Sequence, residues 1–123
     1  MSGQQRSPKP SMHSKAVRAA LIDIGNNIER ARSFVADSDF AQFRDDLKTF
    51  YATTRCLEII SEASRRLPAE LKSRHSHIQW QRIAGAGNIY RHNYDNVAEQ
   101  IVWKTVHEAL PALQKVVEEE LKT

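Results

Sequence analysis

The sequence predicts an all-α protein, an up-and-down bundle of four main helices plus a short helix, and three observations indicate this fold class. Apolar residues recur at steps of three and four along most of the chain, which is the spacing of an amphipathic helix. No segment shows the alternation of apolar and polar residues that is typical of a half-buried strand. Proline, aspartate and serine stand where the apolar periodicity is interrupted, as expected at helix ends.

The first half of the chain contains two predicted helices. The first begins near Ser14 and ends at "VADSD", where aspartate and serine compete with the helical backbone for hydrogen bonds. The second is capped by Ser38 or Asp39 and continues unbroken to Pro68. The residues expected on their apolar stripes are Val17, Ala20, Leu21, Ile24, Ile28, Ala31 and Val35, then Phe43, Leu47, Phe50, Tyr51, Thr54, Leu57, Ile60, Ala63 and Leu67.

The second half begins with a short predicted helix, "PAELKSRH", with proline at its first position. A further helix is expected over residues 80–92, "WQRIAGAGNIYRH", where Gly85 and Gly87 each cost about 1 kcal/mol relative to alanine. The last helix covers residues 96–121, and Pro111 should kink it or start a new segment. Its expected inward residues are Val97, Ile101, Val102, Val106, Leu110, Leu113 and Val117.

Length and composition indicate one intracellular domain. The 123 residues leave no room for two cores, and 41% hydrophobic residues suffice for one. The leader, residues 1–13, is polar and basic and is predicted to be disordered, so the domain is expected at residues 14–123. A single cysteine rules out a disulfide framework, and no apolar run could span a membrane or form a signal peptide. A cytoplasmic location is therefore predicted.

The net charge of +3 permits a polyanionic partner without the concentrated charge of a strong nucleic-acid binder. Neither a metal site nor a cofactor is expected. His75 and His77 lack cysteine or carboxylate partners at zinc spacing, His13 falls in the leader, and His107 stands alone. Cys56 belongs to an apolar stripe, which favours a small core residue over a nucleophile.

The glycine-containing stretch invites comparison with two motifs, one that binds phosphate and one that binds DNA. "GAG" does not match a phosphate-binding loop, which needs GxxxxGK[ST] after a strand. A helix-turn-helix module is an alternative, because a brief connector joins the two short predicted helices. Its recognition helix would offer Arg82 and Arg91 as cations, but glycines are unusual there.

The stretch "GNIYRHNY", residues 87–94, carries the groups that metal-independent RNA cleavage requires. His92 titrates near neutrality and can transfer a proton, and Arg91 presents a fixed fork of donors to a phosphate. Tyr94 adds a phenol two residues further on. The same groups also occur at an ordinary solvated helix end, so the chemistry alone leaves both interpretations open.

Several separated segments resemble the HepT-like proteins of the HEPN superfamily. They are "CLEIISEASRRLPAEL", "IAGAGNIYRHNYDNV" after Trp80, and "IVWKTVHEALPALQKVV", and the similarity covers about residues 14–121. The resemblance implies an HEPN-type helical bundle that forms a homodimer, bringing two Arg-x(4–6)-His motifs into a cleft that cuts RNA without metal. It also implies a toxin whose antitoxin, a minimal nucleotidyltransferase (MNT-like), transfers a nucleotide from ATP to the motif tyrosine.

On this family pattern the motif histidine falls on His92, its tyrosine on Tyr94, and the asparagine that often follows the motif arginine on Asn88. Gly87 stands where the arginine is expected. In a continuous helix, positions 87 and 91 differ by only ~40° around the axis, so Arg91 could replace the missing arginine. Alternatively, Arg91 pairs with Asp95 or with solvent.

The remaining candidates have supporting roles. Glu62 could orient the His92 ring, or it could be a helix-surface charge, although a buried structural role is slightly favoured. Trp80 and Trp103 are expected to anchor the core, and Tyr90 could pack at a dimer interface. An RNA approach could be lined by Arg65, Arg66, Lys72 and Arg74. Without the motif arginine, a second hypothesis remains: a catalytically inactive HEPN dimer that binds RNA or a nucleotidyltransferase.

Overall fold

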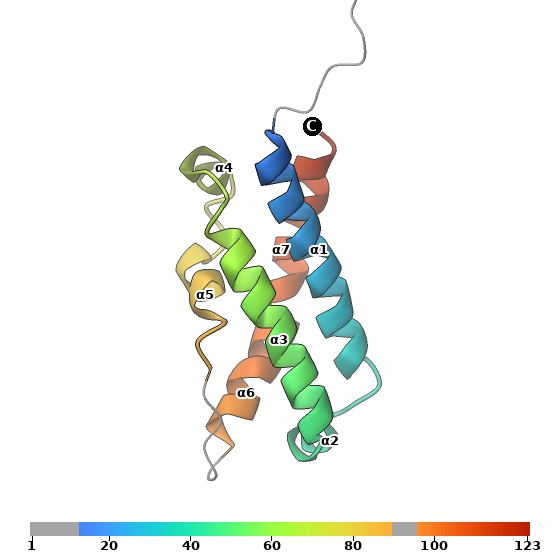
Figure 1. The fold of residues 1–123 in the computed structure, drawn as a ribbon. Coiled ribbons are helices and arrows are strands. Elements are labelled where there is room, and N and C mark those ends of the chain that lie inside the picture. The colour runs from blue at the N-terminus through green and yellow to red at the C-terminus, as the bar shows by residue number, and fades with distance from the viewer. Residues whose placement is uncertain (1–12, 90–95) are drawn as a thin grey trace, which may run out of the picture.

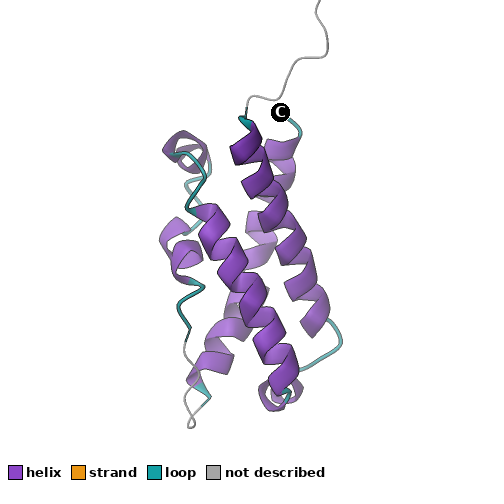
Figure 2. Cartoon of the chain, viewed as in Figure 1, coloured by secondary structure: helices purple, strands orange, loops and turns teal. Residues whose placement is uncertain are grey.

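The computed structural model describes residues 13–89 and 96–123. Every regular element in these residues is a helix, and no strand occurs among them (Figure 2), which confirms the all-α fold class. The elements are α1 (Lys15–Val35), α2 (Phe40–Asp45), α3 (Leu47–Ser64), α4 (Ala69–Arg74), α5 (Trp80–Gly85), α6 (Val97–Lys104), η1 (Thr105–Ala109) and α7 (Leu110–Leu121).

Three long rods form the body of the molecule: α1, α3, and the continuous run α6–η1–α7 (Figure 1). α1 packs along α3 and against α7, while α5 lies on the other side of α3. The first turn of α1 and the last turn of α7 meet at one end of the bundle. None of the helices in the described part of the chain has the length and apolar character needed to cross a bilayer.

α1 agrees with the prediction because its cap and stripe are both strong. The Ser14 hydroxyl accepts a hydrogen bond from the Val17 amide at 3.1 Å, which satisfies one of the free donors at the helix start. The stripe then buries Leu21, Ile24 and Ile28 completely against α3 and α7. Each of these side chains contributes roughly 1.5–3 kcal/mol on burial.

The prediction of a single helix from residue 38 or 39 to Pro68 is wrong, because the helix is interrupted at Asp46. The Asp46 backbone is extended (φ −104°, ψ 90°), and its carboxylate accepts from the amide and hydroxyl of Thr49 at 3.1 and 2.7 Å. Asp46 therefore starts α3 afresh, while Asp39 caps α2 through a capping box with Gln42.

Four apolar residues predicted to face inward are exposed instead. Leu47 and Tyr51 on α3 are 49% and 56% exposed, and Val97 and Ile101 on α6 are 45% and 47% exposed. In both helices the exposed pair lies on a stripe turned away from the buried one. The other expected stripe residues are buried or pack against the core, as do Trp80 and Trp103.

The helix expected over residues 80–92 ends at Gly85. Ala86 and Gly87 form a turn, in which the Asn88 amide donates to the Gly85 carbonyl at 3.0 Å, and Asn88 and Ile89 have no regular structure. The expectation is therefore wrong for residues 86–89. A six-residue α5 is also too short for the recognition helix of a helix-turn-helix module.

The last rod contains a π-helical segment directly before Pro111. Proline has no amide hydrogen and its ring collides with the carbonyl four residues earlier, so an ordinary α-helix cannot accommodate it. The wider turn of η1 precedes α7, and Pro111 lies in the first turn of α7. The prediction that Pro111 starts a new segment is confirmed.

Candidate functional site

A polar groove lies beside the contact between α3 and the residues that follow α5. Its side chains from α3 and from Arg65, the residue after α3, are spaced at i, i+3, i+6, i+7 and i+10, which places them on one face of the helix. The groove encloses about 240 Å³ and is lined by Arg55, Glu58, Ser61, Glu62, Arg65, Gly87 and Asn88.

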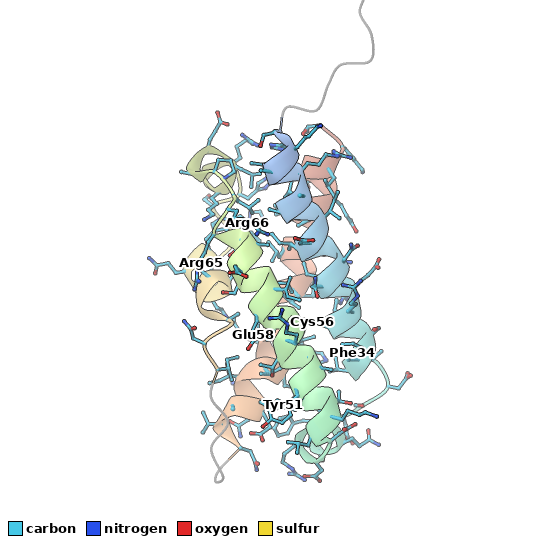
Figure 3. All side chains as sticks on the ribbon, in the orientation of Figure 1. Phe34, Tyr51, Cys56, Glu58, Arg65 and Arg66 are labelled. Atoms are coloured by element: carbon cyan, nitrogen blue, oxygen red, sulfur yellow. The ribbon has the colours of Figure 1, made fainter. Side chains whose placement is uncertain are left out.

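Two α3 side chains hold the end of α5 at the groove. The buried Ser61 hydroxyl and the Arg65 guanidinium both donate to the Ala84 carbonyl, the latter at 2.7 Å. This carbonyl is one of the last in α5, where no amide of the helix itself is available to pair with it. Figure 3 shows Arg65 on the side of α3 that faces α5. The two bonds fix where the chain leaves the helix.

Gly87 is required by a close approach to α3. A Cβ atom at this position would lie 3.2 Å from the Glu58 Cα and 3.3 Å from the Ser61 Cβ, which is closer than nine in ten real Cβ contacts. Its φ angle is not positive, so backbone conformation does not demand glycine here. The residue therefore marks the point where the segment packs directly on the α3 backbone.

The charged groups of the groove are weakly paired. Arg55 donates to Glu58 at 3.2 Å, and these side chains are 70% and 44% exposed. An exposed pair of this kind contributes about 0–1 kcal/mol, so its partners can exchange for other ligands at low cost. Glu62 is also exposed, so the slightly favoured buried structural role is wrong and the alternative of a helix-surface charge agrees with the structure.

Asn88 connects the groove to a second hollow, on the α6 side of the same segment. This hollow encloses about 590 Å³ and combines two cations, Arg82 and Lys104, with apolar walls. Its other lining residues are Gly85, Ala86, Asn88, Ile89, Val97, Ala98, Ile101 and Thr105. Asn88, which the resemblance assigns to the motif, thus lines both spaces.

The motif residues Arg91, His92 and Tyr94, together with Tyr90, lie outside the described residues. In the sequence, His92 is four residues from both Asn88 and Asn96, which the structure does describe. Asn96 adopts a left-handed backbone (φ 56°, ψ 29°), which asparagine tolerates, and it occupies the N-cap position of α6 without a side-chain capping bond.

The helical argument for Arg91 as a substitute at position 87 is overturned. It required residues 87 and 91 to share one stripe of a continuous helix, but Gly87 lies in a turn beyond the end of α5. The proximity of Arg91 to His92 in the chain is unaffected.

The four cations expected along an RNA approach do not gather on one surface. Arg65 lines the groove, whereas Arg66 pairs with Asp23 of α1 at 3.4 Å. Arg74 pairs with Glu120 of α7 at 2.9 Å, and Lys72 is half-buried on α4. The structure therefore brings one of the four to the candidate site.

The ion cluster around Glu120 is the most complete one in the described residues. Its buried carboxylate accepts from Arg74, from His75 at 2.6 Å, and from His13 at 2.8 Å. Burial alone would raise the pKa of Glu120, but these hydrogen bonds outweigh burial and lower the pKa to about 2. His13, at the end of the expected leader, is therefore attached to the bundle, while residues 1–12 lie outside the described residues.

Cys56 is buried, as predicted, and burial raises the pKa of its thiol. No group of three or more histidine, cysteine or carboxylate side chains within residues 13–89 and 96–123 is arranged to hold a metal ion. The sequence reasoning missed Arg55, Glu58 and Ser61 as groove residues. Their shared stripe with Glu62 and Arg65 was a usable signal, because i, i+3 and i+7 positions face the same neighbour.

The fold and site define a helical-bundle protein whose polar groove is lined by residues that come shortly before an Arg-His-x-Tyr stretch of the sequence. Comparison with known sequences identifies the family. The family described as "Ribonuclease HepT-like" matches residues 24–120, so the chain belongs to the HepT-like ribonuclease family. This confirms the resemblance found in the sequence and agrees with membership of the HEPN superfamily.

Relatives from archaea and bacteria match over most of their length. The chain is 38% identical over 94 residues to "Probable ribonuclease HepT" of Thermococcus cleftensis, covering 76% of this chain and 86% of that protein. It is 30% identical over 111 residues to "Putative RNase MJ0125" of Methanocaldococcus jannaschii, covering 90% and 96%. It is 37% identical over 95 residues to "Putative RNase TTE0752" of Caldanaerobacter subterraneus, covering 77% and 81%. No solved structure gave a significant match.

Proposed function

We propose that this protein is a metal-independent endoribonuclease in which His92 transfers the proton and Arg91 contacts the phosphate. Asn88 and Tyr94 complete the site. Membership of a ribonuclease family supports the activity. The proposed location of the active site rests on Asn88, which lines the polar groove and precedes His92 by four residues in the sequence.

The chemistry needs no group beyond those in the chain and the RNA. The 2′-hydroxyl oxygen attacks the adjacent phosphorus and the 5′ oxygen leaves, so one proton must be removed and one supplied. His92 accepts or donates one of these protons near neutral pH, and a guanidinium stabilises the charged phosphorane-like state. Glu62, exposed in the groove, supports the site by orienting the imidazole.

The protein acts in the cytoplasm as the toxin of a HepT/MNT-type pair. Its partner is a nucleotidyltransferase antitoxin, and Tyr94 is the residue that this partner modifies. The phenol oxygen of Tyr94 attacks the α-phosphorus of ATP and pyrophosphate leaves, which places a nucleotide beside His92 and blocks RNA. Mass spectrometry after incubation with ATP and the antitoxin tests this step, with Tyr94→Phe as the matched control.

The active form is a homodimer. Val97 and Ile101 expose apolar surface on α6, directly after the motif segment, and burying them against a second copy would bring two motif segments together. Sedimentation measurements should give a dimer for the wild type and a monomer for Ile101→Asp. A monomeric wild type would contradict this arrangement.

Cleavage of RNA in the presence of EDTA tests the activity. The protein must be purified without the antitoxin, and mass spectrometry must show Tyr94 unmodified. Wild type should cleave, and His92→Ala should lose about 10²–10⁴-fold in rate, the usual contribution of a general acid or base. His107→Ala is the control, because His107 is an exposed histidine on η1. Intact RNA with unmodified wild type would rule out the nuclease.

One observation favours a second function. Gly87 occupies the family's arginine position and packs on the α3 backbone, which leaves no space for a long side chain pointing into α3. A chain that had lost catalysis would remain a binding module for RNA or for a nucleotidyltransferase. RNA binding without cleavage by unmodified wild type would favour this alternative.

A further inference from the structure

We propose that Arg55 of α3 binds an RNA phosphate at the groove, in the place that Gly87 leaves without an arginine. This inference rests on the proposed function, because it assigns a phosphate contact to that same site. It depends on three features of the groove: the close approach at Gly87, the loose pairing of Arg55, and the presence of Glu58 as its partner.

The approach of Gly87 to α3 brings the motif backbone against the helix that carries Arg55. The nearest α3 atom to a Cβ at position 87 would be the Glu58 Cα, at 3.2 Å. Arg55 precedes Glu58 by three positions and lies on the same stripe, and both line the groove with Gly87 and Asn88. A guanidinium from α3 therefore lines the same groove as Gly87 and Asn88, where glycine itself supplies no side chain.

Arg55 is the arginine of the groove that is free to turn toward an anion. Arg65 is committed to the Ala84 carbonyl at 2.7 Å and so holds α5 in place. The described partner of Arg55 is Glu58 alone, at 3.2 Å, and 70% of the Arg55 side chain is exposed. A phosphate can accept two parallel N–H bonds from one guanidinium, which is a stronger arrangement than this single contact.

Glu58 competes with the phosphate for Arg55. The groove contains two arginines and two glutamates, Glu58 and Glu62, so its charge is balanced and it attracts RNA weakly at long range. Binding must therefore come from directed hydrogen bonds, which require Arg55 to leave Glu58. Removing the charge of Glu58 should release Arg55 and strengthen RNA binding.

Two measurements on the full-length protein test the proposal. One is the rate of RNA cleavage in EDTA, and the other is the affinity for a 2′-O-methyl RNA, which cannot be cleaved, over a series of salt concentrations. The variants are Arg55→Ala, Arg55→Lys and Glu58→Gln. The control is Arg18→Ala, because Arg18 is an exposed arginine of α1 that donates to the Leu121 carbonyl on α7.

Arg55→Ala should lower the cleavage rate at least 10-fold. The slope of log binding constant against log salt concentration should become about 0.7 less steep, which is the value for one phosphate contact with a single strand. Arg55→Lys should restore the slope but only part of the rate, since lysine keeps the charge and loses the fork. Glu58→Gln should bind a few-fold tighter. Arg18→Ala should match the wild type, and the urea midpoint of every variant should stay unchanged.

An Arg55→Ala variant with the wild-type slope and the wild-type rate would overturn the proposal, as would a Glu58→Gln variant that binds more weakly. If the wild type binds RNA but does not cut it, the proposed nuclease activity is wrong. The salt dependence of RNA binding by Arg55→Ala still decides whether Arg55 contacts RNA. If wild type neither cuts nor binds RNA, both proposals fail.

Discussion

The groove beside Gly87 and the cluster around Glu120 contain the same kinds of charged group, but their surroundings differ. Glu120 is buried and accepts from three side chains at once, those of His13, Arg74 and His75. Arg55 and Glu58 form an exposed pair through a single contact, and Glu62 beside them is exposed as well. The first arrangement uses up its hydrogen-bonding capacity inside the protein, whereas the second keeps much of it available.

This difference separates a structural cluster from a candidate binding site. A buried carboxylate must be fully paired, because an unpaired charge in the interior is costly, so the Glu120 cluster contributes to the stability of the chain end. Exposed groups in a groove bear no such cost and can exchange partners. Substitutions in the Glu120 cluster should therefore change the free energy of unfolding, and substitutions in the groove should change RNA binding and cleavage.

The largest effect on stability is expected for Glu120→Gln. The substitution keeps the size of the side chain but removes the charge that pairs with His13, Arg74 and His75. The free energy of unfolding should fall by about 1.5–3 kcal/mol, the range for hydrogen bonds to a charged group. Urea unfolding measures this loss. Cleavage per folded molecule should not change, and a lost activity in a folded variant would contradict the division between the two regions.

Glu120 should also give the protein a defined acid sensitivity. The folded pKa of about 2 lies below the ordinary value of 4.5, so the stabilisation is complete above pH 4.5 and is lost as the pH falls toward 2. The loss over this range should be about 3 kcal/mol. Urea midpoints between pH 5 and pH 2 measure it for the wild type and for Glu120→Gln. Equal pH dependence of the two proteins would show that Glu120 does not carry the effect.

The two neighbouring glycines should respond to alanine with opposite signs. At Gly87 the added methyl group meets the Glu58 Cα at 3.2 Å, so crowding should outweigh the gain in chain stiffness and cost about 1 kcal/mol. At Gly85 no atom lies within 4 Å of the added Cβ, and alanine should stabilise the end of α5 by about 0.5 kcal/mol. Thermal unfolding of both variants checks the prediction. A stabilised Gly87→Ala would contradict the close approach.

The smallest effect is expected for Arg66→Ala. Arg66 follows Arg65 but pairs with Asp23 of α1 at 3.4 Å, and both side chains are more than half exposed. The free energy of unfolding should change by less than about 0.5 kcal/mol. Arg65→Ala provides the comparison, since Arg65 donates to the Ala84 carbonyl and its loss should cost more. An equal change in urea unfolding would show that Arg65 does not anchor α5.

The sequence predicted those parts of the fold that depend on local patterns. α1 could be predicted because Ser14 caps it and its apolar stripe is continuous. The break at Asp46 was missed because the apolar spacing continues across it, and an aspartate inside a helical pattern does not reveal whether its side chain will cap the next turn. The exposure of Leu47 and Tyr51 depends on which stripe meets α1, and that choice is made by packing between helices.

The motif residues Arg91, His92 and Tyr94 stay predictions because they lie outside the described residues, and several groove residues around Asn88 were missed. Asn88 and Glu62 were expected there and line the groove. The close packing of Gly87 on α3 was not predicted, because it is a contact between residues distant in sequence. The sequence predicts a helix that continues past Gly85, because two glycines lower helix propensity without forbidding a helix. Packing against α3 ends the helix instead.

The most direct test of the functional contrast is an NMR titration of the full-length protein with 2′-O-methyl RNA. If the groove is the RNA site, the backbone amide signals of Arg55, Gly87 and Asn88 should shift during the titration, and those of His75 and Glu120 should stay in place. Shifts confined to His75 and Glu120, with unchanged signals at the groove, would contradict the account.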